Sequence, residues 1–230
     1  MSANFPRRRR PAVGQEPVRR GGQVYFADAK FSGGQVSFDR AGFSGQVSFD
    51  YAGFSGGQVS FTAAEFSGQV TVTFNGARFS GGLVRFDEAG FSGSQVTFGA
   101  ARFSDGQVRF DHARFSDGQV SFTAAEFSGQ VTVTFNGARF SDGQVRFDGA
   151  RFSGGQVRFA GAVFSGSQVS FGSAGLWSSP PVFDWDHDRS EPPAGVVLPD
   201  RRGILAPPAS FPYGMLTPII VPSSLSPTTW

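Results

Sequence analysis

The apolar residues between Val24 and Leu176 follow a fixed alternation of two units. A Val-x-Phe unit such as Val108–Phe110 is followed five residues later by an Ala-x-Phe unit such as Ala113–Phe115. An insert of one to three residues, usually two, then precedes the next Val unit. Of the 28 phenylalanines, 25 occupy the third position of a unit. This regularity predicts a repeat protein with a period of about 12 residues.

Each unit is expected to form a very short strand followed by a corner. Side chains two residues apart point to the same side of an extended segment, so Val or Ala and the Phe face inward together. The next two residues, such as Asp148-Gly149 or Asn75-Gly76, are typical of turns. Four units then close one square coil. The 26 units predict six and a half coils, stacked about 4.8 Å apart to a height of roughly 31 Å.

A rival interpretation joins each Val unit to its Ala unit as a β-hairpin with a two-residue turn. Such turns favour Gly at a fixed position. The corner pairs do not suit that turn: they include Asp39-Arg40, Asp50-Tyr51, Thr62-Ala63 and Asp111-His112. The coil is therefore the favoured prediction.

Proline marks the limits of the repeat, because all 14 prolines lie outside it. Pro cannot donate to a backbone ladder and is excluded from the interior of a sheet. The chain thus divides into a basic tail at residues 1–22, a β-helix at 23–176 and a Pro-rich segment at 177–230. The first ten or so residues after Leu176 are expected to cap the last coil. Both tails are otherwise expected to be disordered.

Because small-x-Phe-x-x recurs through residues 24–176, about two thirds of the chain, the sequence resembles the pentapeptide-repeat family. The resemblance implies an all-β fold, a right-handed quadrilateral β-helix. It also implies a homodimer formed through the C-terminal coil, near Trp177 and Trp185. Some members of the family imitate duplex DNA and bind type II topoisomerases such as DNA gyrase. The Gly-Gln inserts depart from the family pattern and are expected to bulge at two opposite corners.

One stretch of the repeat occurs twice. Residues Phe61–Ser80 recur without change as Phe122–Ser141, an offset of 61 residues. An identity of this length indicates a recent internal duplication.

Residues that carry catalysis or bind metals are sparse. There is no cysteine, and the two histidines, His112 and His187, are far apart in sequence. No nucleophile–base pair, carboxylate dyad or phosphate-binding loop stands out. We therefore expect a protein that is not an enzyme and that needs no cofactor or metal.

The sequence also favours a cytoplasmic location. The N-terminal arginines are not followed by an apolar segment, unlike those of a signal peptide. No apolar run approaches the roughly 20 residues of a membrane helix. Arginine outnumbers lysine 19 to 1, which is typical of a GC-rich bacterial gene.

Charge is unevenly divided among the four faces obtained by counting units. The candidate anion- or partner-binding residues lie on one Ala face (Lys30, Arg78, Arg102, Arg151) and on the Val face that follows it (Arg85, Arg109, Arg158). The opposite Val face is rich in Ser and Thr: Ser48, Thr73, Thr97, Ser121 and Ser170. Asp39, Asp87 and Asp111 lie beside the second basic face, so the alternative is a solvated surface of balanced charge. In the tail, Arg7, Arg8, Arg9 and Arg10 are candidate phosphate contacts.

Three functions remain open. The first is a scaffold that presents flat faces to a protein partner. The second is the gyrase-binding DNA mimic implied by the resemblance, although the repeat has 11 basic and 12 acidic residues and lacks the strongly acidic surface of a mimic. The third is nucleic-acid binding through the basic tail and the Arg faces.

Overall fold

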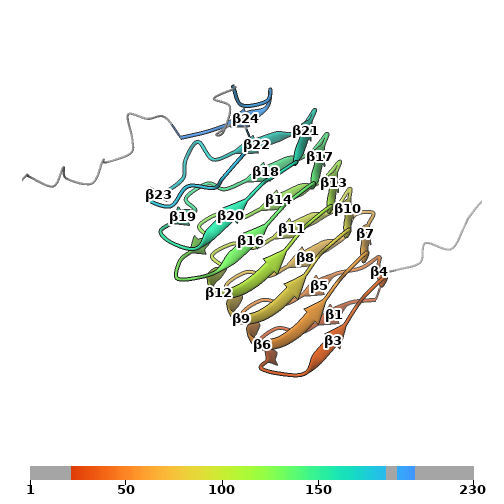
Figure 1. The fold of residues 1–230 in the computed structure, drawn as a ribbon. Helices are drawn as coiled ribbons and strands as arrows, with labels where there is room; N and C mark the ends of the chain where they lie inside the picture. The colour runs from red at the N-terminus through yellow and green to blue at the C-terminus, as the bar shows by residue number, and fades with distance from the viewer. Residues whose placement is uncertain (1–21, 185–190, 200–230) are drawn as a thin grey trace, which may run out of the picture.

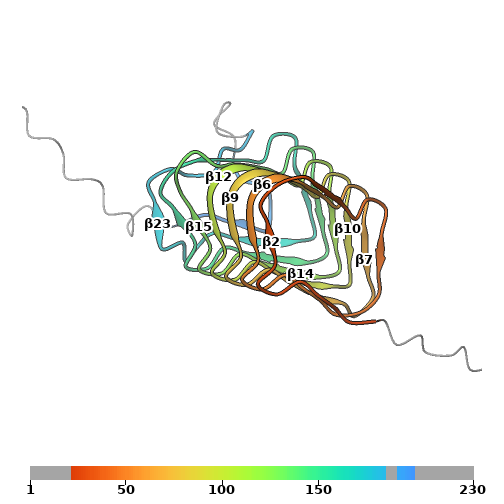
Figure 2. The same cartoon turned by 90° about the horizontal axis from the view of Figure 1, so that it is seen from below.

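A computed structural model describes residues 22–184 and 191–199 of the chain. These residues wind into a rod of short strands, and each strand pairs in parallel with the strands one coil before and one coil after it (Figure 1). The described residues contain no helix. Viewed from the N-terminal end, the chain runs clockwise away from the viewer (Figure 2). The predicted right-handed quadrilateral β-helix is therefore confirmed.

Three parallel sheets form the walls of the rod, and we number four faces in the order in which the chain visits them. Face 1 is sheet A, made of β1 (Val24–Tyr25), β5 (Val47–Ser48), β8 (Thr71–Thr73), β11 (Gln95–Thr97), β14 (Gln119–Ser121), β18 (Gln144–Arg146), β22 (Gln168–Ser170) and β24 (Val196–Val197). Face 4 is sheet C, made of β4 (Gly42–Phe43), β7 (Glu65–Ser67), β10 (Gly90–Ser92), β13 (Arg114–Ser116), β17 (Arg139–Ser141) and β21 (Val163–Ser165).

Sheet B covers two faces, because three of its strands run around the corner between them. The long strands are β6 (Gly53–Ser60), β9 (Arg78–Arg85) and β12 (Arg102–Arg109). Face 2 is completed by the Ala-unit strands β2 (Lys30–Phe31), β15 (Glu126–Phe127), β19 (Arg151–Phe152) and β23 (Leu176–Trp177). Face 3 is completed by the Val-unit strands β3 (Gln35–Ser37), β16 (Thr132–Thr134) and β20 (Gln156–Arg158). The inserts therefore extend the ladder here, with register shifts at the corner.

Phenylalanine rings fill the interior in four columns, one behind each face. Rings in successive coils stack with centroids 4.4 to 5.1 Å apart, close to the spacing of strands in a sheet. The columns of faces 1 and 3 also meet edge to face, as Phe49 and Phe61 do at 5.5 Å and 89°. Offset-stacked and edge-to-face contacts are the arrangements that aromatic pairs prefer. The core is thus a continuous aromatic stack along the axis.

The corner after each Val unit is a four-residue turn. Ala41 N–H donates to the carbonyl of Phe38, for example, at 3.0 Å. The third residue of this turn has positive φ even where it is not glycine: 58° at Arg40, 60° at Tyr51 and 59° at His112. The sequence argued against these residues in a two-residue hairpin turn, and the turn that they form is instead a corner of the coil. The stacked coils impose the conformation instead, at a cost of about 1–2 kcal/mol per residue.

The inserts between units have different structural roles: some let the backbones of successive coils approach closely, and others add a buried side chain. At the corner between faces 2 and 3, Gly106 approaches the coil below so closely that a Cβ would lie 2.6 Å from the carbonyl oxygen of Gly82. The two three-residue inserts each add an inward valine, and Val70 and Val131 are 2% and 0% exposed. In these coils Thr71 and Thr132 replace Gln in register before the Val unit.

The two ends of the rod differ. After Leu176 the chain continues the winding: Trp177 packs edge-on against Phe152, Phe183 stacks on Phe159 at 5.0 Å, and β24 pairs with β22. At the N-terminal end no described residue covers the first coil. Its inward apolar side chains are only half-buried: Val24, Phe26, Phe31, Val36, Phe38 and Phe43. Of the predicted tails at residues 1–22 and 177–230, residues 1–21, 185–190 and 200–230 lie outside the described residues.

Candidate functional site

Face 2 brings four of the candidate cations into one outward column. In register the column reads Lys30, Gly53, Arg78, Arg102, Glu126, Arg151 and Leu176. Lys30, Arg78 and Arg151 are exposed, and the ion pairs among the described residues do not include them. The one acid in the column, Glu126, lies 3.9 Å from the guanidinium of Arg102. Face 2 thus carries positive charge that its own carboxylate does not balance.

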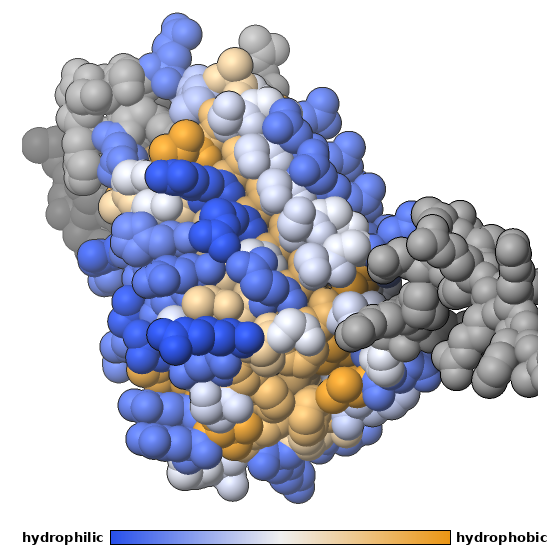
Figure 3. Space-filling model, turned by 90° about the vertical axis from the view of Figure 1, so that its right-hand side faces the viewer, coloured by the Kyte–Doolittle hydropathy of each residue, from blue (hydrophilic) through white to orange (hydrophobic). Residues whose placement is uncertain are grey.

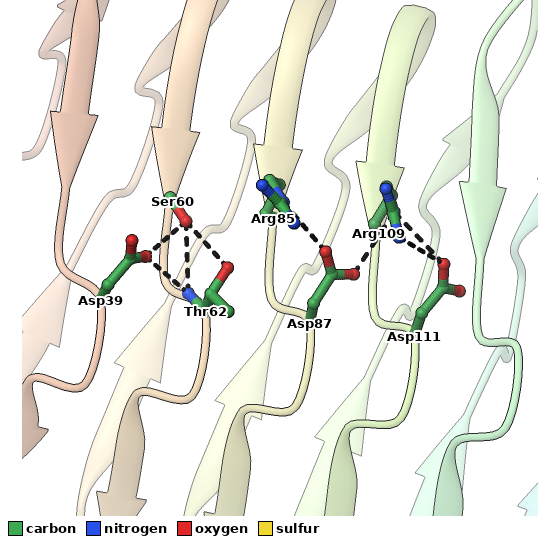
Figure 4. A network of polar contacts seen from close by, with 7 residues as sticks. All are labelled: Asp39, Ser60, Thr62, Arg85, Asp87, Arg109 and Asp111. Carbon is green, nitrogen blue, oxygen red and sulfur yellow. Dashed lines mark hydrogen bonds and ion pairs between the residues drawn. The ribbon is translucent and has the colours of Figure 1, made fainter.

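Face 3 has the predicted arginines in a column, but the neighbouring corner neutralises two of them. Arg85 donates to Asp87 at 2.9 Å, and Arg109 contacts both Asp87 at 3.4 Å and Asp111 at 3.1 Å (Figure 4). The Asp87 side chain is 8% exposed. A buried carboxylate needs such partners, since an unpaired charge in the interior is costly. Arg85 and Arg109 therefore serve the structure of the corner. Arg158 donates to Gln156 instead.

The same corner holds a carboxylate with a shifted pKa. The hydroxyl of Ser60 and the backbone N–H of Thr62 both donate to Asp39 Oδ1 (Figure 4). The hydrogen bond from Ser60 is the main reason that the pKa of Asp39 lies below its ordinary value, against the opposing effect of desolvation. This carboxylate stabilises the fold by tying one coil to the next.

Three further exposed arginines lie on faces that the sequence did not single out. Arg114 and Arg139 are neighbours in sheet C, and Arg146 interrupts the Ser/Thr column of sheet A. Arg114 reaches Glu65, two coils away, at 3.0 Å, and Arg146 pairs with Asp148 at 2.6 Å. Counting units would have assigned all three arginines to their faces, but only the structure shows that two of them form ion pairs with carboxylates.

The corner between faces 4 and 1 is hollowed into an open groove of about 480 Å³. Its walls are amides and carboxylates, chiefly Gln95, Gln119, Gln144 and Gln168 with Asp117 and Asp142. Such a lining offers hydrogen-bond donors and acceptors and contains no nucleophile–base pair. Within the described ranges, no three His, Cys, Asp or Glu side chains gather where they could hold a metal ion.

The structure bears only in part on the expected phosphate contacts of the tail and on the expected lack of a membrane helix. Arg7, Arg8, Arg9 and Arg10 lie outside the described residues. Over residues 22–184 and 191–199, no helix has the length and apolar character to cross a membrane.

Comparison with known proteins identifies weak structural matches and no family. No family model matches the chain, and no curated protein matches it. Among solved structures, two trypsin-treated forms of QnrB1, described as a plasmid-mediated fluoroquinolone resistance protein, match at 13% identity with TM-scores of 0.29 and 0.24. They cover 72% and 73% of this chain and 92% and 94% of their own. Full-length QnrB1 matches at 14% identity over 70% of this chain and 96% of its own, with a TM-score of 0.17. At this level of likeness no function carries over to this chain.

Proposed function

We propose that this protein is a non-enzymatic scaffold of the pentapeptide-repeat type, whose face 2 binds the acidic surface of a partner protein. The supporting observation is the column of exposed, mostly unpaired cations on a flat sheet. Aromatic stacking behind the sheet holds the backbone of the column, so little backbone entropy is lost on binding. Complementary charge steers association and selects against basic partners.

The charge of face 2 also bears on the alternatives. A positive column suits a scaffold that binds an acidic partner. A gyrase-binding DNA mimic would instead present an acidic, DNA-like surface. Direct binding of a nucleic-acid backbone is the second candidate, because phosphates are attracted by the same cations. The tail arginines Arg7–Arg10 would add to that attraction.

A pair of matched variants tests the proposal. One replaces Arg78, Arg102 and Arg151 on face 2 by Ser. The other replaces Arg114, Arg139 and Arg146, on faces 4 and 1, by Ser and so removes the same charge. The probes are fluorescent poly-L-glutamate, as a stand-in for an acidic protein surface, and a 20-base-pair DNA duplex, each titrated across a salt series.

The proposal predicts that the face 2 variant loses about tenfold or more in affinity for poly-L-glutamate, whereas the control loses less than about threefold. Equal losses would show that only net charge matters and would refute a dedicated face. Stronger binding of the duplex than of the polypeptide, reduced by Arg7–Arg10→Ser, would favour the nucleic-acid candidate. Partners captured from lysate by the parent and lost with the face 2 variant would then be identified.

A further inference from the structure

The N-terminal end of the rod exposes core residues that the coils in the middle of the rod bury. Phe26 and Phe38 in the first coil are half-buried, whereas the rings stacked on them, Phe49 and Phe61, are 0% exposed. Figure 3 views the right-hand side of Figure 1. Apolar residues gather in the lower part of this side, over the N-terminal coils. At the C-terminal end Phe183 is 2% exposed where it closes the column above Phe159, while Phe164 and Trp177 are half-buried.

The first coil also leaves its backbone open. Among the described residues, β1, β2, β3 and β4 each pair with a strand on one side only. An open strand edge is a template for another chain. The end therefore combines apolar side chains with strand edges that have room for a partner.

We propose that this open end binds the same end of a second copy of the chain, giving a closed two-fold dimer. The proposal places the interface at the N-terminal coil rather than at the C-terminal coil. The first coil, residues 23–46, has 24 residues. That number lies within the roughly 20–30 residues that each partner contributes to an interface of standard size. Two equal ends that meet face to face leave no further copy of this surface exposed, so assembly stops at two.

Charges on the rim fix the orientation of the two copies. Asp28 and Arg40 occupy the same turn position at opposite corners, with φ of 59° and 58°, and both are exposed. A two-fold axis along the other diagonal of the coil exchanges these two corners. Asp28 of each copy then lies against Arg40 of the other, and the facing strand edges run antiparallel.

The chain's own N-terminal segment is a poorer occupant. Residues 1–21 contain one Phe and three Pro and lack the alternating Val and Ala units. A coil that matches the four rings of the first coil needs a Phe in every unit and excludes Pro from its strands. A second copy instead offers four rings in a matching arrangement.

The dimer has a consequence for face 2. The two-fold axis passes through the corner shared by faces 2 and 3. Sheet B of one copy therefore continues into sheet B of the other, on the same side of a rod twice as long. The dimer does not depend on the proposed function. It would place face 2 of one copy end to end with face 3 of the other, so the two cation columns would lie on adjacent sides of the longer rod.

Sedimentation equilibrium of the full chain and of two matched variants tests the interface. Val36→Glu places a charge on the half-buried first coil, and Val163→Glu places the same charge on an outward position that is 52% exposed. We expect the parent and Val163→Glu to be dimers at about 100 µM. Val36→Glu is expected to be a monomer with an unchanged far-ultraviolet circular dichroism spectrum, because an unpaired buried charge opposes association.

Charge reversal provides a second test that does not touch the core. Asp28→Arg and Arg40→Asp are each expected to weaken dimerisation about tenfold, because each juxtaposes like charges twice. The double variant is expected to recover to within about threefold of the parent. Glu88→Arg, at the equivalent turn position two coils later, serves as the control.

Three outcomes would overturn the proposal. The first is a full chain that is monomeric at about 100 µM, and amide-hydrogen protection of the first coil in that monomer would assign the end to the chain's own segment. The second is a Val36→Glu variant that dimerises like the parent. The third is a double charge variant no better than either single one, which would exclude the proposed orientation.

Discussion

Residues Phe61–Ser80 and Phe122–Ser141 have one sequence but lie on opposite sides of the coil. The first copy begins on face 3 and the second on face 1, because the offset amounts to an odd number of half coils. Their backbones agree: Ala63 and Ala124 have φ of 54° and 56°, and both copies bury the extra valine of the insert. The corner turn and the burial of the extra valine therefore follow the local sequence on either face.

The polar groups of the two copies differ because their neighbours in the next coil differ. Oδ1 of Asn75 accepts hydrogen bonds from the hydroxyl of Thr97 at 2.8 Å and the N–H of Gly99 at 3.1 Å. Arg158 stands where Thr97 would be beside Asn136, and the buried Oδ1 of Asn136 finds no hydrogen-bond partner among the described residues. Stacking partners, rather than the repeat itself, decide which side-chain hydrogen bonds form.

The largest predicted effect tests whether the aromatic core is equivalent in the two copies. Phe74 stacks between rings 4.8 Å away on both sides, and Phe135 between rings at 4.8 and 4.7 Å. Phe74→Ala and Phe135→Ala should each lower the free energy of unfolding by about 3–5 kcal/mol, measured by urea denaturation. Phe26→Ala, on the half-buried first coil, is the control and should cost less. A gap of more than about 1 kcal/mol between the first two would show that the copies are not equivalent.

The asparagines should separate the two copies where the phenylalanines do not. Asn75→Ala removes a carbonyl that accepts two hydrogen bonds and is expected to cost about 1–2 kcal/mol. Asn136→Ala removes an unsatisfied oxygen and should change the free energy of unfolding by less than about 0.5 kcal/mol. Equal costs in the same denaturation experiment would mean that the coil above has no influence on the residue below.

Glycine at the strained turn position should stabilise both copies alike. Ala63→Gly and Ala124→Gly remove the Cβ that opposes positive φ, and each is expected to add about 0.5–1 kcal/mol to the free energy of unfolding. Ala77→Gly, at a buried inward position just before β9, is the control that should destabilise. Loss of stability at either turn would contradict the assigned backbone conformation.

The smallest effect concerns Asp39, which occupies in an earlier coil the corner position that Asn136 holds. Because its pKa is lowered in the folded chain, its contribution is complete above the ordinary carboxyl pKa and is lost as pH falls through the folded pKa. The stability difference between the parent and Asp39→Asn should therefore be constant near neutral pH and shrink in acid. A stability difference that grows on acidification would contradict the assigned lowering of the pKa of Asp39.

Much of this architecture follows from the sequence because every unit repeats one local solution. The spacing of Val, Ala and Phe predicts the four inward columns, and counting units places Arg78 and Arg102 on one face. Ion pairing was harder to predict, since Arg109 reaches back one coil to Asp87 and Arg114 reaches back two to Glu65. The repeat pattern also did not predict that Phe183 continues a ring column, because Phe183 does not end a Val-x-Phe unit.

A period that spans half a coil gives changes in repeat number a geometric consequence. Insertion or deletion of a single period turns everything downstream by half a revolution about the rod. The aromatic columns would pass through such an event intact, because opposite faces accept the same units. The cation column, however, would end at the insertion and resume on face 4. Copy-number variation in a gene of this kind therefore redraws the surface pattern of its product while leaving its interior unchanged.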